Sequence, residues 1–202
     1  MIPEPAKERL LHLMRLLERH PDTITSAEAE LLTGWSSHTI RKDISYLGVA
    51  DAVGNSTGYV PAVLIAAIRS ALNLDRQQRL CIVGLGRLGS AYLNFLGAKT
   101  DEYVLVAGFD SNVNRIEILK SPVPLYPAYK APEIIRRFEL ETALLCVPED
   151  AAQEAAEKLV EAGIRGILNF APVALKLPQD IAVRNVNVTN ELRSLSIKLT
   201  NS

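Results

Sequence analysis

Apolar residues in the first third of the chain recur at the spacing of amphipathic helices. Across residues 5–20, apolar side chains follow the i, i+3, i+4, i+7 pattern, and Pro21 ends it. The stripe consists of Leu10, Leu13, Met14 and Leu17. This segment is therefore expected to be a helix that packs on other elements through one face.

Two further helices are expected next, separated by a turn. Thr25 lies three residues before a glutamate, which is the spacing of a capping box, and the helix that it begins stops at Gly34. The following helix begins at Ser36 or Ser37 and ends at Gly48. Two helices joined by a turn of about four residues that contains a glycine are typical of a helix-turn-helix.

The pattern after this helix pair indicates a hairpin. Residues 49–61 place Gly, Asn, Ser and Thr between two short apolar pieces, and residues 60–74 have the composition of one more helix. A small hairpin added to three helices would form the wing of a winged helix.

The rhythm changes near residues 76–79, where short apolar runs begin to alternate with helical segments. The expected strands cover residues 80–84, 104–110, 142–148 and 166–170, and the expected helices cover residues 87–96, 131–138 and 151–163. Strands that alternate with helices predict βαβ units and a parallel sheet covered on both faces. This half is therefore expected to be a Rossmann-like, doubly wound domain.

The sequence thus predicts an α/β chain in three parts. They are a winged helix-turn-helix domain at 1–79, a Rossmann domain at 80–188 and a C-terminal helix at 189–202. The last helix places Leu192, Leu195 and Leu199 on one apolar face. This face either packs back on its own domain or docks on a partner subunit.

A glycine-rich loop stands where the first predicted strand meets its helix. Gly84 is expected to make the tight turn, Gly86 to let a pyrophosphate approach the backbone, and Gly89 to allow close packing of the helix. Asp110 ends the next strand, where an acid accepts hydrogen bonds from a ribose and favours NAD over NADP. Arg115 is near enough to soften that preference. We therefore expect bound NAD(H).

The chemistry expected of an enzyme is missing around this loop. The three histidines, His12, His20 and His38, all precede the predicted nucleotide domain, and none of the common catalytic motifs is present. A lysine or tyrosine base remains open, but a sensor is favoured over an enzyme. Cys81 and Cys146 lie in strand-like runs without metal spacing, so we expect buried reduced thiols and no metal site.

Size and hydropathy exclude a membrane-spanning chain. The 202 residues carry a formal net charge of -1, and the longest nearly uncharged apolar run, Val60–Ile68, is shorter than the roughly 20 residues that a span needs. We expect a cytoplasmic protein without a signal peptide.

The second helix of the predicted helix-turn-helix is the candidate for contacts with DNA. Its exposed donors would be Ser37, His38, Thr39, Arg41, Lys42, Ser45 and Tyr46. Arg41 is the best candidate for a guanine or phosphate contact. Over residues 1–79, however, nine basic residues are balanced by nine acidic ones, so a helix pair that only packs or dimerises stays open.

Nearly the whole chain resembles the redox-sensing transcriptional repressors called Rex. The resemblance is carried by the stretches TSAE, TIRKDISYLG, GYVPAVL, LCIVGLGRLGSA, AGFD, LLCVP and AAQEAAEKLVEAGIRGILNFAPV. It implies a homodimer with a swapped C-terminal helix, binding to operator DNA, and release when NADH binds. It also implies the following cofactor-binding residues: Gly84, Leu85, Gly86, Arg87, Leu88, Gly89, Asp110, Arg115, Val147, Pro148, Asn169 and Ala171.

The resemblance also implies a switch. The family holds its DNA-competent state with an arginine, an aspartate and a tyrosine, and places a phenylalanine in the partner's nicotinamide pocket. The matching residues here are Arg15, Asn187, Phe95 and Val188. An arginine that faces a neutral asparagine loses charge assistance, and Phe95 has no hydroxyl group.

Two alternatives follow from these residues. One is a diverged Rex paralogue that binds NAD(H) but has a weakened or lost redox response or DNA binding. The other is an NAD- or CoA-binding enzyme component, since GIRGILNFAPV is also similar to the CoA-binding domains of CoA ligases.

Overall fold

The computed structural model describes residues 2–20, 22–48, 58–96 and 102–200. The chain divides into two compact units, Met1–Arg76 and Gln77–Ser202.

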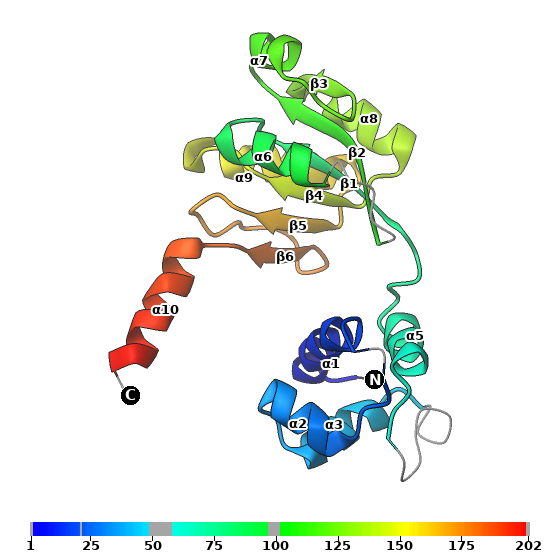
Figure 1. Ribbon diagram of the computed structural model, residues 1–202. Helices are drawn as coiled ribbons and strands as arrows, with labels where there is room; N and C mark the ends of the chain where they lie inside the picture. Colours follow the sequence, from blue (N-terminus) through cyan, green and yellow to red (C-terminus); the bar gives the residue numbers. More distant parts are fainter. Residues whose placement is uncertain (1, 21, 49–57, 97–101, 201–202) are drawn as a thin grey trace. The chain divides into compact units, whose positions relative to one another are not determined.

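The N-terminal unit is built from helices (Figure 1). Its described helices are α1 (Glu4–Leu17), α2 (Ser26–Thr33), α3 (Ser37–Ser45) and α5 (Pro61–Ala71). Their apolar faces enclose one core, made of Leu10, Leu13, Met14, Leu17, Ile24, Ala29, Ile40, Ile44, Leu64 and Ile68. The stripe predicted for the first helix is therefore buried as expected.

Local signals define the helix-turn-helix. The predicted capping box is present at α2, because the Thr25 hydroxyl accepts the N–H of Glu28 and the Glu28 carboxylate accepts the N–H of Thr25. Gly34 ends α2 in a left-handed conformation with φ +73°, and Ser36 caps α3 by accepting the N–H of Thr39. The helix α3 ends at Ser45, three residues before the predicted stop, since residues 46–48 form a turn.

The predicted wing falls mostly outside the described residues. Residues 49–57 are not described, but Tyr59 pairs with Ile24 in an isolated antiparallel bridge. The two backbone hydrogen bonds of this bridge measure 3.0 and 2.7 Å.

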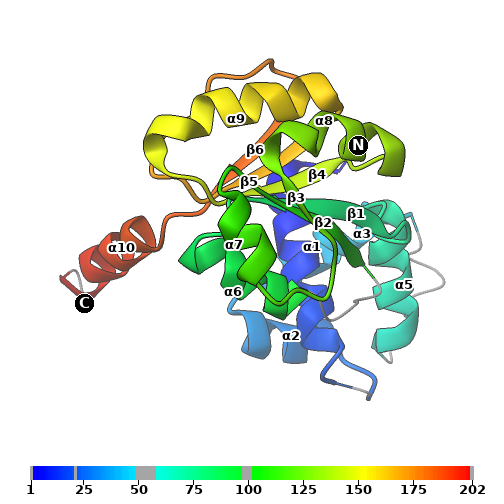
Figure 2. The ribbon, with the colours of Figure 1, turned by 90° about the horizontal axis from the view of Figure 1, so that it is seen from above.

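The C-terminal unit contains a parallel sheet between layers of helices (Figure 2). The strands are β1 (Gln78–Val83), β2 (Tyr103–Asp110), β3 (Leu125–Pro127), β4 (Thr142–Leu145), β5 (Gly166–Asn169) and β6 (Ala182–Asn185). Their order is β3-β2-β1-β4-β5-β6, and every neighbouring pair is parallel. This is the order of the dinucleotide-binding Rossmann sheet, so the predicted fold class is confirmed.

The strand residues alternate between two cores. In β1, Cys81 and Val83 pack into the core beneath α8 (Ala131–Phe138) and α9 (Glu149–Ala162). Leu80 and Ile82 face the opposite core, which α6 (Arg87–Leu96) covers. Burial on both faces explains why the central strands read as continuous apolar runs.

Several short elements were not expected from the sequence. They are α7 (Val113–Ile118), β3, the 3-10 turn η1 (Ala128–Lys130) and β6. None of them has a fully buried residue, so no periodic apolar pattern marks them.

The last helix, α10 (Val188–Thr200), leads away from the sheet after β6 (Figures 1 and 2). None of its described residues is buried in the single chain. Leu192, Leu195 and Leu199 are 58%, 53% and 71% exposed. Within the described part of this chain, the apolar face therefore lacks the fold-back packing that the sequence left open.

Candidate functional site

The glycine-rich loop joins β1 to α6 in a backbone conformation that favours glycine, as its residues predict. Gly84 has φ +91°, and a Cβ there would lie 2.7 Å from the carbonyl group of Cys146. A Cβ on Gly89 would collide with the carbonyl oxygen of Gly84. A Cβ on Gly86, by contrast, would meet no heavy atom of the described residues within 4 Å. The loop therefore packs tightly against the sheet but leaves open space beside Gly86.

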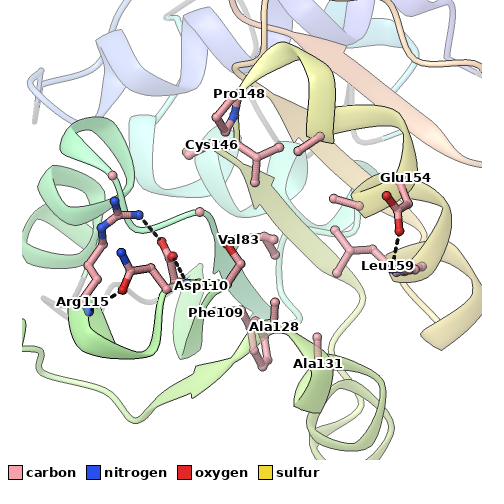
Figure 3. Close-up of a pocket in the computed structure, with 18 of the residues that line it drawn as sticks. Val83, Phe109, Asp110, Arg115, Ala128, Ala131, Cys146, Pro148, Glu154 and Leu159 are labelled. Atoms are coloured by element: carbon pink, nitrogen blue, oxygen red, sulfur yellow. Dashed lines mark hydrogen bonds and ion pairs between the residues drawn. The ribbon is translucent and has the colours of Figure 1, made fainter. Parts of the chain in front are cut away.

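A pocket of about 1210 Å³ lies beside this loop, over the carboxyl ends of β1, β2 and β4 (Figure 3). Parallel sheets bind ligands at this edge, where the strand order reverses. The volume exceeds the roughly 300–1,000 Å³ of drug-sized pockets and suits a dinucleotide. The first helical N–H groups of α6 face such a ligand with the positive end of the helix dipole.

Asp110 stabilises the loop from the end of β2. Its side chain is 3% exposed. One carboxylate oxygen accepts the N–H of Leu85 at 2.6 Å and the guanidinium of Arg115 at 2.8 Å, and the other accepts the N–H of Asn112 at 2.7 Å. Burial alone would raise the pKa of Asp110, but the hydrogen bonds from Asn112, Arg115 and Leu85 outweigh it and lower that pKa. The carboxylate is therefore charged and fixed in place.

The pocket gathers most of the predicted cofactor residues, but not all. Eight of the twelve line it: Gly84, Gly86, Arg87, Leu88, Asp110, Arg115, Val147 and Pro148. The other four, Leu85, Gly89, Asn169 and Ala171, are buried outside the lining.

Asn169 has a structural environment. It is fully buried, and its amide nitrogen donates to the carbonyl oxygen of Val173 and to the side-chain oxygen of Asn185, each at 2.8 Å. Its own side-chain oxygen accepts the N–H of Ala171 at 3.0 Å. Its amide therefore braces the chain after β5.

Other residues that line the pocket carry no signal in the sequence. Tyr129 of η1 lines it and is 76% exposed. Glu154 and Lys158, an ion pair at 2.6 Å on α9, line it as well. A turn and the exposed face of a helix carry no motif, so only the folded chain brings these residues to the glycine loop.

The helix α3 presents its basic residues on the surface of the N-terminal unit. Arg41 and Lys42 are exposed, and the Arg41 guanidinium donates to the Ser26 hydroxyl at 2.9 Å. Asp43 faces inward instead, where it is 3% exposed and paired with Arg9. The two exposed charges of α3 are therefore both positive. The equal numbers of basic and acidic residues in the first 79 positions did not reveal this.

Some of the other residues predicted to contact DNA form hydrogen bonds within α2, α3 and the turn between them. The hydroxyl groups of Thr39 and Ser36 lie 2.9 Å apart, and the Ser45 hydroxyl donates to the carbonyl oxygen of Lys42. Ser37 is half-buried, and its N–H donates to the Glu30 carboxylate at 2.8 Å. Tyr46 is 37% exposed just after the helix.

The four predicted switch residues are accessible in the single chain. Arg15 is exposed on α1, and Phe95 of α6 and Val188 of α10 are 75% and 68% exposed. Asn187 precedes α10, and its side-chain oxygen accepts the N–H of Asn190 at 3.1 Å. Its amide therefore caps α10.

Both cysteine thiols have raised pKa values. Cys81 is buried as expected, whereas Cys146 is only half-buried beside the loop, and both are free. Burial raises the pKa of each thiol to about 12, so neither forms a thiolate near neutral pH. No group of three or more His, Cys, Asp or Glu in the described ranges could hold a metal ion. The described helices are likewise too short or too polar to cross a membrane.

Curated relatives match the chain over nearly its full length. The redox-sensing transcriptional repressor Rex of Levilactobacillus brevis is 34% identical over 198 residues, which cover 96% of this chain and 92% of the relative. The Rex repressor of Listeria welshimeri is 31% identical over 204 residues, with coverage of 99% and 94%. A family model described as a CoA binding domain matches residues 75–173.

Solved structures give the same result. The crystal structure of RSP, a Rex-family repressor, is 30% identical with a TM-score of 0.86, and the match covers 100% of this chain and 95% of RSP. RSP in complex with beta-NAD+ and operator DNA is 30% identical with a TM-score of 0.89 and coverage of 100% and 94%. RSP in complex with beta-NADH is 28% identical with a TM-score of 0.87 and coverage of 100% and 95%. The chain therefore belongs to the Rex family of redox-sensing transcriptional repressors.

Proposed function

We propose that the chain is a homodimeric transcriptional repressor that binds operator DNA through α3 and releases it when NADH binds beside the glycine loop. The observation that carries the proposal is the coexistence of the two halves in one chain: an exposed basic helix of a helix-turn-helix and a dinucleotide-sized pocket on a Rossmann sheet. Its full-length similarity to RSP, which binds beta-NAD+ and operator DNA, supports joining them. Such a repressor acts in the cytoplasm and catalyses no reaction.

The residues fit NAD(H) in the pocket. The open space beside Gly86 admits a pyrophosphate to the backbone N–H groups at the start of α6. Asp110 and Arg115 lie where the adenosine ribose would follow, and Arg87 adds a positive charge for the phosphates. When bound, the nicotinamide ring carries one additional hydride in NADH and lacks it in NAD+. The protein's part is to bind the two forms with different affinities.

The residues of α3 fit the major groove. A recognition helix presents early side chains to base edges and later ones to the backbone. In this proposal the exposed Arg41 contacts a guanine edge or a phosphate, and the exposed Lys42 contacts a phosphate. We propose that the exposed apolar face of α10 is covered by the second copy of the chain, because an apolar stripe of this size is unfavourable in water.

The test is a titration of fluorescently labelled DNA at fixed salt, because phosphate contacts make affinity depend on salt. The probes are the operator duplex that RSP binds and a random duplex of equal length, each with NAD+ or NADH. The proposal predicts preference for the operator with NAD+ and weaker binding with NADH. Equal binding of both duplexes at low salt would refute the DNA-binding claim for this operator class.

A second candidate is a paralogue that keeps the nucleotide and DNA but has lost NADH-triggered release. The observation in its favour is that Phe95 offers no hydroxyl group and that Asn187 caps α10 with a neutral amide. Operator affinity that is equal with NAD+ and NADH would support this candidate, and strong release by NADH alone would exclude it.

A further inference from the structure

We propose that the ion pair between Arg9 of α1 and Asp43 of α3 positions the DNA-facing side of α3, so that these two residues determine operator specificity without touching DNA. The inference rests on the proposed function, since it takes α3 as the helix that binds DNA. Neither residue lies in the nucleotide pocket, and Asp43 is the one buried acid of the described N-terminal unit.

The geometry of the pair is directional. The Arg9 guanidinium donates from Nε to one oxygen of Asp43 at 2.6 Å and from Nη2 to the other at 2.8 Å. Two parallel hydrogen bonds between a planar guanidinium and a planar carboxylate fix orientation as well as distance. The hydrogen bond to Asp43 also raises the pKa of Arg9, as expected when a carboxylate stabilises the charged guanidinium.

Asp43 sits in the apolar stripe of its helix. Ile40 and Ile44 are 2% and 3% exposed, and Asp43, which is 3% exposed, lies beside them at the edge of the same buried face. Contacts between apolar side chains are non-directional and tolerate small rotations of a helix. The two charge-assisted hydrogen bonds to Arg9 therefore fix the rotation of α3 about its axis, which contacts of the two isoleucines do not fix.

The pair fixes where the basic residues point. Successive residues of an α-helix are about 100° apart around its axis. Arg41 precedes Asp43 by two residues, so it projects about 160° from the carboxylate and away from the core. Because Arg9 holds Asp43 inward, a rotation of α3 that would tilt Arg41 out of its register on DNA would distort the geometry of these two hydrogen bonds.

The pair also hides a negative charge. Asp43 is the only acid within α3, and its inward position leaves Arg41 and Lys42 as the exposed charges of the helix. A carboxylate on the outer face would repel the phosphate backbone of DNA. The acid is thus used for alignment while the outer face stays positive.

The test replaces the carboxylate with its near-isosteric amide. Asp43→Asn keeps the shape and one acceptor but loses the charge and the second acceptor oxygen. The matched control is Glu4→Gln, which makes the same chemical change in an exposed ion pair on α1, with Lys7 at 2.9 Å. Arg9→Lys is the conservative variant, because it keeps the positive charge without the planar fork.

Each variant is titrated with the operator duplex that RSP binds and with a random duplex of equal length, at one salt concentration. The temperature of each titration is well below the thermal unfolding midpoint of the variant that is titrated. The measured quantity is the ratio of operator affinity to random affinity. We expect Asp43→Asn to reduce this ratio about tenfold or more, the value of one misplaced base contact. Its affinity for random DNA should not fall, since the change removes a negative charge. Arg9→Lys should reduce the ratio by a smaller factor, and Glu4→Gln should leave it unchanged.

A role limited to folding stability would lower the unfolding midpoint without changing the ratio in the folded protein. If Asp43→Asn and Arg9→Lys both fold and both show the wild-type ratio of operator affinity to random affinity, this inference is overturned. The proposed function is not affected by that result. If Asp43→Asn does not fold, Arg9→Lys decides the question. A wild-type protein without preference for the operator would refute the proposed function and, with it, this inference.

Discussion

Replacing Gly86 with alanine should separate nucleotide binding from folding. A Cβ at this position would meet no heavy atom of the described residues within 4 Å, so the folded chain accepts it. Where the backbone conformation suits both residues, Gly→Ala stabilises a protein by about 0.4–1 kcal/mol, because the unfolded chain loses freedom. The thermal unfolding midpoint of Gly86→Ala should therefore stay at or slightly above that of the wild type.

The same methyl group should obstruct the dinucleotide. It occupies the open space through which the pyrophosphate approaches the N–H groups at the start of α6. An extra methyl group in a filled site costs about 1–3 kcal/mol. At about 1.4 kcal/mol per tenfold change, NADH should bind about 5- to 150-fold more weakly. The measurement is a titration followed by NADH fluorescence, with thermal unfolding recorded on the same preparation.

Two other glycines make the comparison decisive. Gly166 in β5 lies outside the pocket lining, and a Cβ there would be 3.5 Å from the Thr142 hydroxyl, an ordinary contact. Gly166→Ala should therefore change neither property. Gly84→Ala should lower stability by about 2–5 kcal/mol, since it combines a left-handed backbone with overlap at Cys146. NADH affinity of Gly86→Ala within twofold of the wild type would refute the assigned path of the pyrophosphate.

Substitutions at four further positions test other parts of the account. Arg41→Ala should weaken operator binding by about 1–3 kcal/mol and leave NADH affinity unchanged; DNA and NADH titrations check this, and unchanged operator affinity would remove Arg41 from the interface. Tyr129 lines the pocket with an exposed ring, so we expect it to stack on adenine. Tyr129→Ala should then weaken NAD+, NADH and ADP-ribose alike by about 1–3 kcal/mol, whereas Tyr129→Phe should not; calorimetric affinities of the alanine variant equal to those of the wild type would exclude stacking. The lowered pKa of Asp110 means that its contribution to stability is present above the unfolded pKa of about 3.9 and is lost as the pH falls through the folded value. Asp110→Asn should therefore lower the urea-unfolding free energy at pH 7 by about 1–3 kcal/mol, and the difference should shrink below about pH 4; a deficit that is independent of pH would contradict the assigned charge. Leu195→Glu should convert a dimer to a monomer in sedimentation, and a dimer that persists would show that α10 does not form the interface.

The sequence predicted the elements that carry strong local signals. The capping box at Thr25, the left-handed stop at Gly34 and the glycine loop all appear where the pattern placed them, because each depends on neighbouring residues. The strand β3 escaped notice, since Leu125–Pro127 is three half-buried residues long and contains a proline. β6 has no buried residue at all, so it offers no apolar alternation.

The sequence predicted the site residues that belong to a local motif. It did not predict those that only the folded chain brings to the pocket. Gly84, Gly86 and Asp110 are marked by spacing alone. Tyr129 reaches the pocket only because η1 follows β3 at the edge of the sheet. A charge count likewise could not reveal that Asp43 turns inward to Arg9, since that depends on the packing of α1 against α3.

The central claim, that one chain couples NADH to operator DNA, is tested most directly by measuring NADH affinity with and without the operator duplex that RSP binds. Coupling between two sites is reciprocal, so each ligand must change the affinity of the other by the same factor. The account predicts that saturating operator weakens NADH binding by the factor by which NADH weakens operator binding, about 5- to 150-fold for a typical coupling, with no such effect of random DNA. NADH affinity that is unchanged by bound operator would contradict it.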